Sequence, residues 1–147
     1  MIADFERLLG SELAEIAAAA AAFGEWAERA ALTRREVFLV GVALEELVTN
    51  VIVHGLGIGR PGWVRLRIAH RGDHLTLELR DNAPPFDPFQ IPLPQLDADI
   101  DARAVGGLGV HLVRTLVDEY SYTRVDGQNV VRLLKRLGGP GSRPGPS

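Results

Sequence analysis

The stretch of this sequence that is most informative about its architecture reads Glu45-Glu46-Leu47-Val48-Thr49-Asn50-Val51-Ile52-Val53-His54-Gly55. Two polar side chains stand out in it, the Glu46 carboxylate and the Asn50 carboxamide. Residues four apart advance a helix by about 400°, so both side chains would project from one face, roughly one turn apart. An amide oxygen is a hard ligand suited to Mg²⁺, and a neighbouring Glu could take a proton from a nucleophile that attacks a phosphate. The stretch therefore predicts a helix that carries a site for phosphate chemistry.

The composition is that of an ordinary globular domain. The chain has 147 residues, of which 46% are hydrophobic and 24% charged, enough for one hydrophobic core. A formal net charge of −3 argues against nucleic-acid binding, which favours basic surfaces. The absence of cysteine excludes disulfides and thiolate metal sites. We expect a cytoplasmic protein without a membrane segment, because the N-terminus lacks a signal-like pattern and the longest apolar run, residues 16–23, is short and mostly alanine.

Two helices are predicted in the first third of the chain. Residues 11–30 are rich in alanine, which has the highest helix propensity, and Ser11 can cap that helix. Thr33 and Glu36 have the spacing of a capping box, so a second helix begins there and ends at Gly55. The two polar residues of the opening stretch fall on the other side of the helical wheel from its apolar stripe, which comprises Val40, Leu44, Leu47, Val48 and Val51.

A change of apolar period to two predicts a β-hairpin after the second helix. Residues 63–70 and 75–80 each alternate between apolar and polar positions, and residues 71–73 form the turn between them. The hairpin ends at Asp81. Residues 4–9 are compatible with either a short first strand or an irregular lead-in.

A second hairpin closes the domain. Residues 120–125 and 130–137 read as strands joined by Asp126-Gly127. Between the two hairpins lie a long proline-rich connection, residues 82–105, and a third predicted helix, residues 110–119. This order predicts a two-layer α/β sandwich, with a mixed, mainly antiparallel sheet and the helices on one face.

Asp81 stands where an alternating strand gives way to prolines. A carboxylate at a strand end can accept a hydrogen bond from the exocyclic amine of adenine, which distinguishes adenine from guanine. An Asp that merely begins a turn is the alternative, and local sequence alone favours it.

A glycine-rich segment, Gly106-Gly107-Leu108-Gly109, precedes the third predicted helix. Glycines let backbone amides approach an anion, and a helix N-terminus adds its dipole. A flexible hinge explains the glycines equally well. The segment is not a Walker A loop, because no Gly-Lys-Ser or Gly-Lys-Thr follows.

Other polar residues give weaker indications. Glu45 is adjacent to Glu46 and is interpreted as a solvated flank. His54 fits a partner for the C-terminal dipole of its helix. His111 could contact a phosphate or be an ordinary surface histidine. The acidic run at residues 97–101 lacks the glycine and glutamate of a calcium loop and is interpreted as solvated.

In combination, these motifs resemble the histidine-kinase-like ATPase family, also called the GHKL family, which has the Bergerat fold. Within that family, the chain is most similar to the small anti-sigma factor serine kinases of the SpoIIAB/RsbW type. The matching stretches are residues 44–55, 80–88 and 106–114, and the likeness spans roughly residues 10–137.

The resemblance implies a role for each motif. Asn50 would hold Mg²⁺ bound to the triphosphate of ATP. Glu46 would be the general base that accepts a proton from a Ser or Thr hydroxyl of a partner protein. Asp81 would bind the adenine amine.

The later glycine-rich segment would serve the phosphates. Residues 87–105 would form the ATP lid, and Arg103 within it would supply positive charge to the γ-phosphate. Gly107 and Gly109 would bring backbone amides to the phosphates.

Two positions depart from the family pattern. Ala83 stands where members usually have glycine, two residues after the adenine-binding Asp, and alanine costs little there unless a positive φ is needed. Asn129 falls where members usually place a Thr near the adenine, and it keeps a polar group there. Both residues would remain part of the nucleotide site.

Three functions are compatible with this resemblance. The first is an anti-sigma factor serine/threonine kinase, which phosphorylates an anti-sigma antagonist and holds or releases a sigma factor. The second is a non-catalytic module in which ATP or ADP gates protein binding, and the third is a GHKL-type ATPase of another signalling system. A sensor kinase core is disfavoured, because no histidine precedes His54.

Family members commonly dimerise, so a homodimer is compatible with the resemblance. The ATP-binding domain would span residues 1–137, and the Gly- and Pro-rich residues 138–147 would be a disordered tail.

Overall fold

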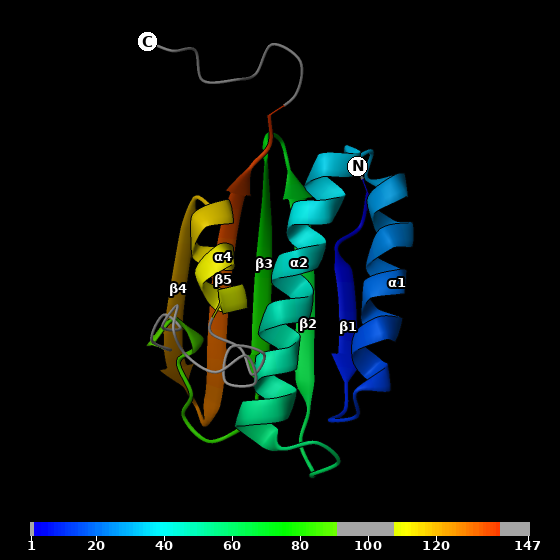
Figure 1. Ribbon diagram of the computed structural model, residues 1–147. Helices are drawn as coiled ribbons and strands as arrows, with labels where there is room; N and C mark the ends of the chain where they lie inside the picture. Colours follow the sequence, from blue (N-terminus) through cyan, green and yellow to red (C-terminus); the bar gives the residue numbers. More distant parts are fainter. Residues whose placement is uncertain (1, 91–107, 139–147) are drawn as a thin grey trace.

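The computed structural model describes residues 2–90 and 108–138, which form a five-stranded sheet with the described helices packed on one face (Figure 1). The elements in chain order are β1 (Phe5–Leu9), α1 (Ala14–Arg29), α2 (Arg34–Asn50), η1 (Val51–Leu56), β2 (Val64–Arg71), β3 (His74–Asp81), η2 (Pro88–Gln90), α4 (Leu108–Leu116), β4 (Glu119–Val125) and β5 (Gln128–Arg136). The two-layer α/β sandwich predicted from the sequence is confirmed.

The strand order is β1-β2-β3-β5-β4, and each of the four pairings is antiparallel. Residues 5–9, for which the sequence left two options, form an edge strand along β2. The predicted turn at Asp126-Gly127 is confirmed, and both residues have positive φ, 51° and 76°. The pairing of β3 with β5 joins the two hairpins and sets Asp81 directly opposite Asn129.

Ser11 is not the N-cap of α1, so that expectation is wrong. The helix begins at Ala14, after Leu13, whose side chain makes no capping hydrogen bond. The Ser11 hydroxyl is buried and donates to the Arg60 carbonyl oxygen at 2.5 Å. A buried hydroxyl needs a partner, and here it ties the loop before β2 to the start of α1 instead of capping the helix.

The predicted capping box of α2 is confirmed. The Thr33 hydroxyl accepts from the Glu36 N–H at 3.1 Å, and the Thr33 N–H donates to the Glu36 carboxylate at 2.8 Å. The predicted stop at Gly55 is wrong, because α2 continues through one π-helical turn and ends at Gly57. Gly57 has the positive φ, 94°, that terminates a helix, and its N–H donates to the Ile52 carbonyl at 2.9 Å.

The combined helix Arg34–Leu56 is long and apolar enough to cross a membrane by composition alone, the one such helix in the described residues. Its apolar face packs on the sheet, where Leu44, Val48 and Ile52 are fully buried. Packing in the core of the domain accounts for the apolar character of this helix.

The helices on either side of α2 are fixed differently. At α1, the rings of Phe5, Phe23 and Trp26 pack together, and the centroids of each pair lie 6.1 Å apart. This cluster holds α1 against the edge strand β1. At α4, the helix begins and ends two to three residues earlier than predicted. It ends because the Asp118 N–H already donates to the Leu134 carbonyl of β5 at 2.9 Å.

Candidate active site

The candidate site lies where the C-terminal half of α2 faces the start of α4 and the adjoining ends of β3 and β5 (Figure 1). The residues that the sequence singled out come to this region from three separate parts of the chain. Two groups form there, one around Glu46 and Asn50 on α2 and one around Asp81 and Asn129 on the sheet.

Glu46 packs against the first turn of α4. A Cβ placed on Gly109 would lie 1.9 Å from Glu46 Oε2 and 2.1 Å from its Cδ, so any larger residue at that position would displace the Glu46 carboxylate or the first turn of α4. The Glu46 side chain is half-buried and receives no hydrogen bond from the described residues. Burial raises the pKa of its carboxyl above the ordinary value, and the negative charge of Glu45 adds to the rise. The structure thus brings two predicted residues, 63 positions apart, into contact around a carboxylate of raised basicity.

Asn50 is 3% exposed, although the helical wheel places it away from the apolar stripe of α2. Its Nδ2 atom is buried and has no hydrogen-bond partner in the described part of the chain. Buried polar groups are rarely left unpaired. Rotation of the carboxamide would put Oδ1 in the same place. Asn50 therefore offers either a hydrogen-bond donor or an acceptor oxygen to a ligand.

Asp81 is the last residue of β3 and is 2% exposed. Its Oδ1 atom accepts from the Ala83 N–H at 3.0 Å and from Asn129 Nδ2 at 2.8 Å. The bond to Ala83 makes Asp81 the start of a turn, as the alternative interpretation held. Its Oδ2 atom receives no hydrogen bond from the described residues, so the same side chain also keeps an acceptor for a ligand.

Burial raises the pKa of the Asp81 carboxyl, and the hydrogen bonds from Asn129 and Ala83 and the charge of Arg124 oppose that rise. These neighbours stabilise the ionised form of the carboxyl, whereas burial, the larger effect, disfavours it. Replacing one of those neighbours would therefore change the pKa of Asp81 and its strength as a hydrogen-bond acceptor.

Ala83 is 1% exposed and keeps an ordinary negative φ, since the described non-glycine residues with positive φ are Ala31 and Asp126. The replacement of glycine by alanine therefore introduces no backbone strain. A Cβ on Gly55 would lie 3.3 Å from the Ala83 methyl group. Gly55 thus serves the close approach of α2 to the segment after β3, which explains a glycine that does not end the helix.

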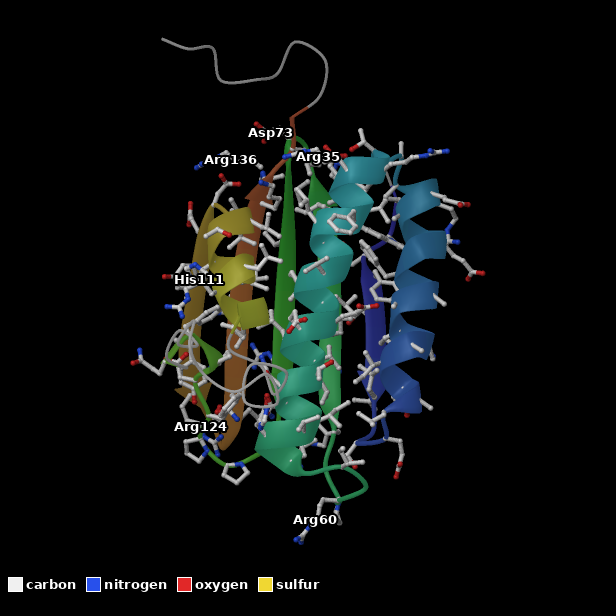
Figure 2. All side chains as sticks on the ribbon, viewed as in Figure 1. Arg35, Arg60, Asp73, His111, Arg124 and Arg136 are labelled. Atoms are coloured by element: carbon white, nitrogen blue, oxygen red, sulfur yellow. The ribbon has the colours of Figure 1, made fainter. Side chains whose placement is uncertain are left out.

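Sequence reasoning missed Tyr122 and Arg124, which contact Asn129 from β4. The Tyr122 hydroxyl donates to Asn129 Oδ1 at 2.5 Å, and Arg124 Nη1 donates to the same atom at 3.0 Å. Figure 2 labels Arg124 at the lower end of the sheet, where β3 ends. The signal that could have found it is the two-residue turn of the second hairpin, which sets Arg124 opposite Asn129.

Several predicted features lie outside the described residues. These are Arg103, Gly107, the acidic run at 97–101, most of the predicted lid (residues 91–105) and nearly all of the predicted tail (residues 139–147). His111 projects from α4 on the side away from α2 (Figure 2), which fits a surface histidine better than a phosphate contact.

A cavity of about 550 Å³ lies over the face of the sheet that the described helices leave open. None of the candidate residues lines it. Its arginines are already paired: Arg67 and Arg71 each lie 2.8 Å from Asp4, and Arg132 lies 2.9 Å from Glu78. We therefore place the candidate site on the helical side of the sheet and not in this cavity.

A helix-borne acid and amide, set over a sheet whose third strand ends in a buried Asp, define the histidine kinase-like ATPase type of domain. The chain belongs to that family, and the family model matches residues 9–135. The resemblance predicted from the sequence is confirmed.

Two curated relatives carry the kinase activity that the resemblance implied. The serine/threonine-protein kinase BtrW of Bordetella bronchiseptica is 30% identical over 112 residues, which cover 74% of this chain and 79% of BtrW. The serine-protein kinase RsbW of Listeria innocua is 26% identical over 109 residues, which cover 71% of this chain and 69% of RsbW.

A solved structure supports the fold. The chain is similar to the crystal structure of the RsbU and RsbW domains of Rv1364c from Mycobacterium tuberculosis, with a TM-score of 0.65 and 18% sequence identity. The match covers 95% of this chain and 34% of that protein, so the chain corresponds to about a third of its length.

Proposed function

We propose that the chain is an anti-sigma factor serine/threonine kinase, which transfers the γ-phosphoryl group of ATP to a hydroxyl of a small anti-sigma antagonist. The two curated relatives named as kinases support this function. The observation that carries it is the half-buried Glu46 carboxylate, which lies one helical turn from Asn50 and in contact with Gly109.

Glu46 would act as the general base. The hydroxyl oxygen of the antagonist's Ser or Thr bonds to the γ-phosphorus, the bond from that phosphorus to the bridging oxygen breaks, and ADP leaves. Glu46 accepts the hydroxyl proton. A base is most effective when its pKa lies near the working pH, and the burial that raises the pKa of Glu46 moves it in that direction.

Asn50 would hold Mg²⁺ through its carboxamide oxygen. The unpaired, buried end of that carboxamide fits a residue whose partner is a ligand. The described residues contain no cluster of three or more His, Asp or Glu side chains able to bind a metal. The ion would therefore depend on the ATP phosphates and water for its other ligands, as Mg²⁺ commonly does, and it would neutralise phosphate charge.

The remaining predicted residues would bind the nucleotide. Asp81 would accept a hydrogen bond from the adenine amine, with Ala83 and Asn129 lining the same end of the site. Gly107 and Gly109 would serve the phosphates, with Arg103 in the lid over residues 87–105.

The contact between Glu46 and Gly109 supports a second candidate function. The first turn of α4 packs against the Glu46 carboxylate, so a movement of α4 would change the access of a hydroxyl to that carboxylate. A module in which ATP or ADP repositions α4 and thereby gates protein binding, without transfer, would use the same contact.

The biological setting follows from the resemblance and the relatives. The partners would be the antagonist and, for regulation, a sigma factor. The chain would act in the cytoplasm. A homodimer would be compatible with this function. The ATP-binding domain would comprise residues 1–137, followed by a disordered tail over residues 138–147.

The test is transfer from labelled ATP to candidate antagonist proteins by Glu46→Gln. We expect this variant to keep ATP affinity and to lose transfer. Glu45→Gln is the matched control, because Glu45 is adjacent, exposed and has the same side chain. Equal phosphorylation by wild type and Glu46→Gln would reject the general-base role, and ATP binding without transfer by the wild type would favour the gating module.

A further inference from the structure

We propose that the substrate protein, which brings the Ser or Thr hydroxyl to Glu46, docks on the seam between α2 and α4. This seam runs from Glu46 and Gly109 at one end to Leu39 and Leu116 at the other. The inference rests on the proposed function, because it names the surface by which the substrate protein reaches the proposed base.

Contacts at both ends define the seam, along which α2 and α4 lie side by side (Figure 1). Glu46 packs against Gly109 at one end, and Leu39 and Leu116 line a common crevice at the other. Leu39 lies seven residues before Glu46, and Leu116 lies seven residues after Gly109, so the two helices run antiparallel. Seven residues make about two helical turns and about 10 Å, so the crevice lies on the same side of α2 as the Glu46 carboxylate.

The crevice is small and mostly apolar. The aliphatic residues that line it include Leu39, Ala43, Leu116, Val117 and Leu133. Its free volume is about 20 Å³, which holds one water-sized group and no separate small ligand. Leu39 and Leu116 are partly exposed, so the crevice is open to solvent and fits the tip of an apolar side chain from a partner.

Two exposed apolar side chains flank this seam. Phe38 of α2 is 67% exposed and Leu112 of α4 is 45% exposed. Leu112 lies three residues after Gly109 and four before Leu116, so the three residues share the face of α4 that meets α2. Phe38 directly precedes Leu39. Together with the crevice, these side chains form an apolar patch on the outer surface of the two helices, and aromatic residues are frequent anchors of protein interfaces.

The position of Glu46 indicates which partner covers this patch. A stable interface covers about 800 Å² of each protein. A folded protein whose hydroxyl lies at Glu46 therefore extends well beyond the length of about 10 Å that separates Glu46 from the crevice. The sheet lies beneath α2 and α1 packs along its other side, so the outer surface of the seam is the part of α2 that remains for this protein.

Lys135 indicates the charge of the docking segment. It is the one lysine of the chain, it lines the crevice, and it makes no hydrogen bond or ion pair within the described residues. The next residue, Arg136, points to the opposite face of the sheet and is paired with Glu119 at 3.7 Å. The segment that fits is therefore an apolar side chain with a carboxylate close to it.

The experiment measures the KM for a candidate antagonist that the wild type phosphorylates from labelled ATP, together with ATP affinity by calorimetry. Phe38→Ala and Leu112→Ala should each raise this KM about tenfold, the effect of truncating an interface anchor, and leave ATP affinity unchanged. Leu8→Ala and Val125→Ala are the matched controls on the edge strands β1 and β4. Leu8 is 67% and Val125 is 44% exposed, as Phe38 and Leu112 are nearly, so these controls should leave the KM unchanged.

The possible outcomes are distinct. A KM that stays at the wild-type value in Phe38→Ala and Leu112→Ala, or that rises equally in the controls, overturns the docking proposal while phosphoryl transfer stands. Loss of self-association in Phe38→Ala with an unchanged KM would assign the patch to a second copy of the chain and also overturns it. A wild type that phosphorylates no candidate would reject the proposed function, and this inference with it.

Site-specific crosslinking gives a second measurement, since the chain has no cysteine. Leu112→Cys and Val125→Cys can each carry one photoactivatable maleimide crosslinker. In the presence of ATP, the same antagonist should be captured from position 112 and not from position 125. Equal capture from both positions contradicts docking on the seam.

The charge assigned to the docking segment is tested with Lys135→Met, which removes the ammonium and keeps a long side chain. At low salt, the KM for the antagonist should rise about two- to fivefold, the effect of one exposed ion pair. The difference from wild type should shrink at high salt, where such pairs are screened. Arg136→Met is the control and should leave the KM unchanged. Equal effects of the two variants would contradict a carboxylate beside Lys135.

Discussion

Replacing Gly109 by alanine tests the contact on which the proposed catalytic arrangement depends. Three atoms of Glu46 lie within 2.8 Å of the position that the new Cβ would occupy, and the nearest, Oε2, lies at 1.9 Å. Ordinary contact begins near 3.4 Å. The carboxylate or the first turn of α4 must therefore move by about 1.5 Å, because real side chains do not overlap in this way.

The magnitude follows from two opposing effects. Overpacking of this kind typically costs about 1–3 kcal/mol. Alanine in a helix gains up to about 1 kcal/mol over glycine. We expect Gly109→Ala to lower the free energy of unfolding by about 1–2 kcal/mol and to reduce phosphoryl transfer, since the displaced group is the proposed base. Gly41→Ala is the control, because Gly41 lies in α2 and a Cβ there meets nothing within 4 Å; it should be neutral or stabilising.

Urea unfolding of a double-mutant cycle identifies the colliding partner. In a Glu46→Ala background the carboxylate is gone, so adding Gly109→Ala should no longer destabilise the protein. Destabilisation of the same size in both backgrounds would show that alanine at position 109 meets something other than Glu46. An increase in stability for Gly109→Ala alone, equal to that of Gly41→Ala, would refute the contact itself.

Three further predictions concern single residues. Asn50→Ala should weaken ATP binding in Mg²⁺ and leave it unchanged in EDTA, because the proposed contact is to the metal; calorimetry in both buffers checks this, and equal losses would argue against a ligand role. The pKa of Asp81 is raised in the folded state, so its ionised form destabilises the protein at neutral pH, and this penalty is removed as the pH falls through the raised pKa. Asp81→Asn should therefore be more stable than wild type in urea at pH 7, with a difference that shrinks toward acid pH; a difference that grows would reverse the assigned sign. Thr33→Ala removes the hydroxyl that accepts from the Glu36 N–H and should cost about 1 kcal/mol, and unchanged urea stability would show that the cap is replaced by solvent.

Local signals in the sequence were sufficient wherever a local interaction decides the structure. The capping box at Thr33 and the turn at Asp126-Gly127 each involve residues close in sequence, and both were predicted correctly. Ser11 was assigned wrongly because its partner, the Arg60 carbonyl, lies 49 residues away. The burial of Asn50 could not be predicted, because the helical wheel describes α2 alone and does not show that α4 packs against this helix.

The contact between Asp81 and Asn129 could not be predicted from local sequence patterns, because it depends on the order of the strands in the sheet. Each hairpin fixes its own register through its turn, so the sequence alone sets Arg124 opposite Asn129 once the second turn is recognised. Nothing local specifies which strand of the first hairpin joins the second. The choice of β3 as the partner of β5 places the Asp81 carboxylate within 2.8 Å of the Asn129 amide, across 48 residues of chain. The chemistry of residue 81 is thus an outcome of strand order, and a site inferred from motifs alone omits the residues of β4 that give its acceptor a fixed direction.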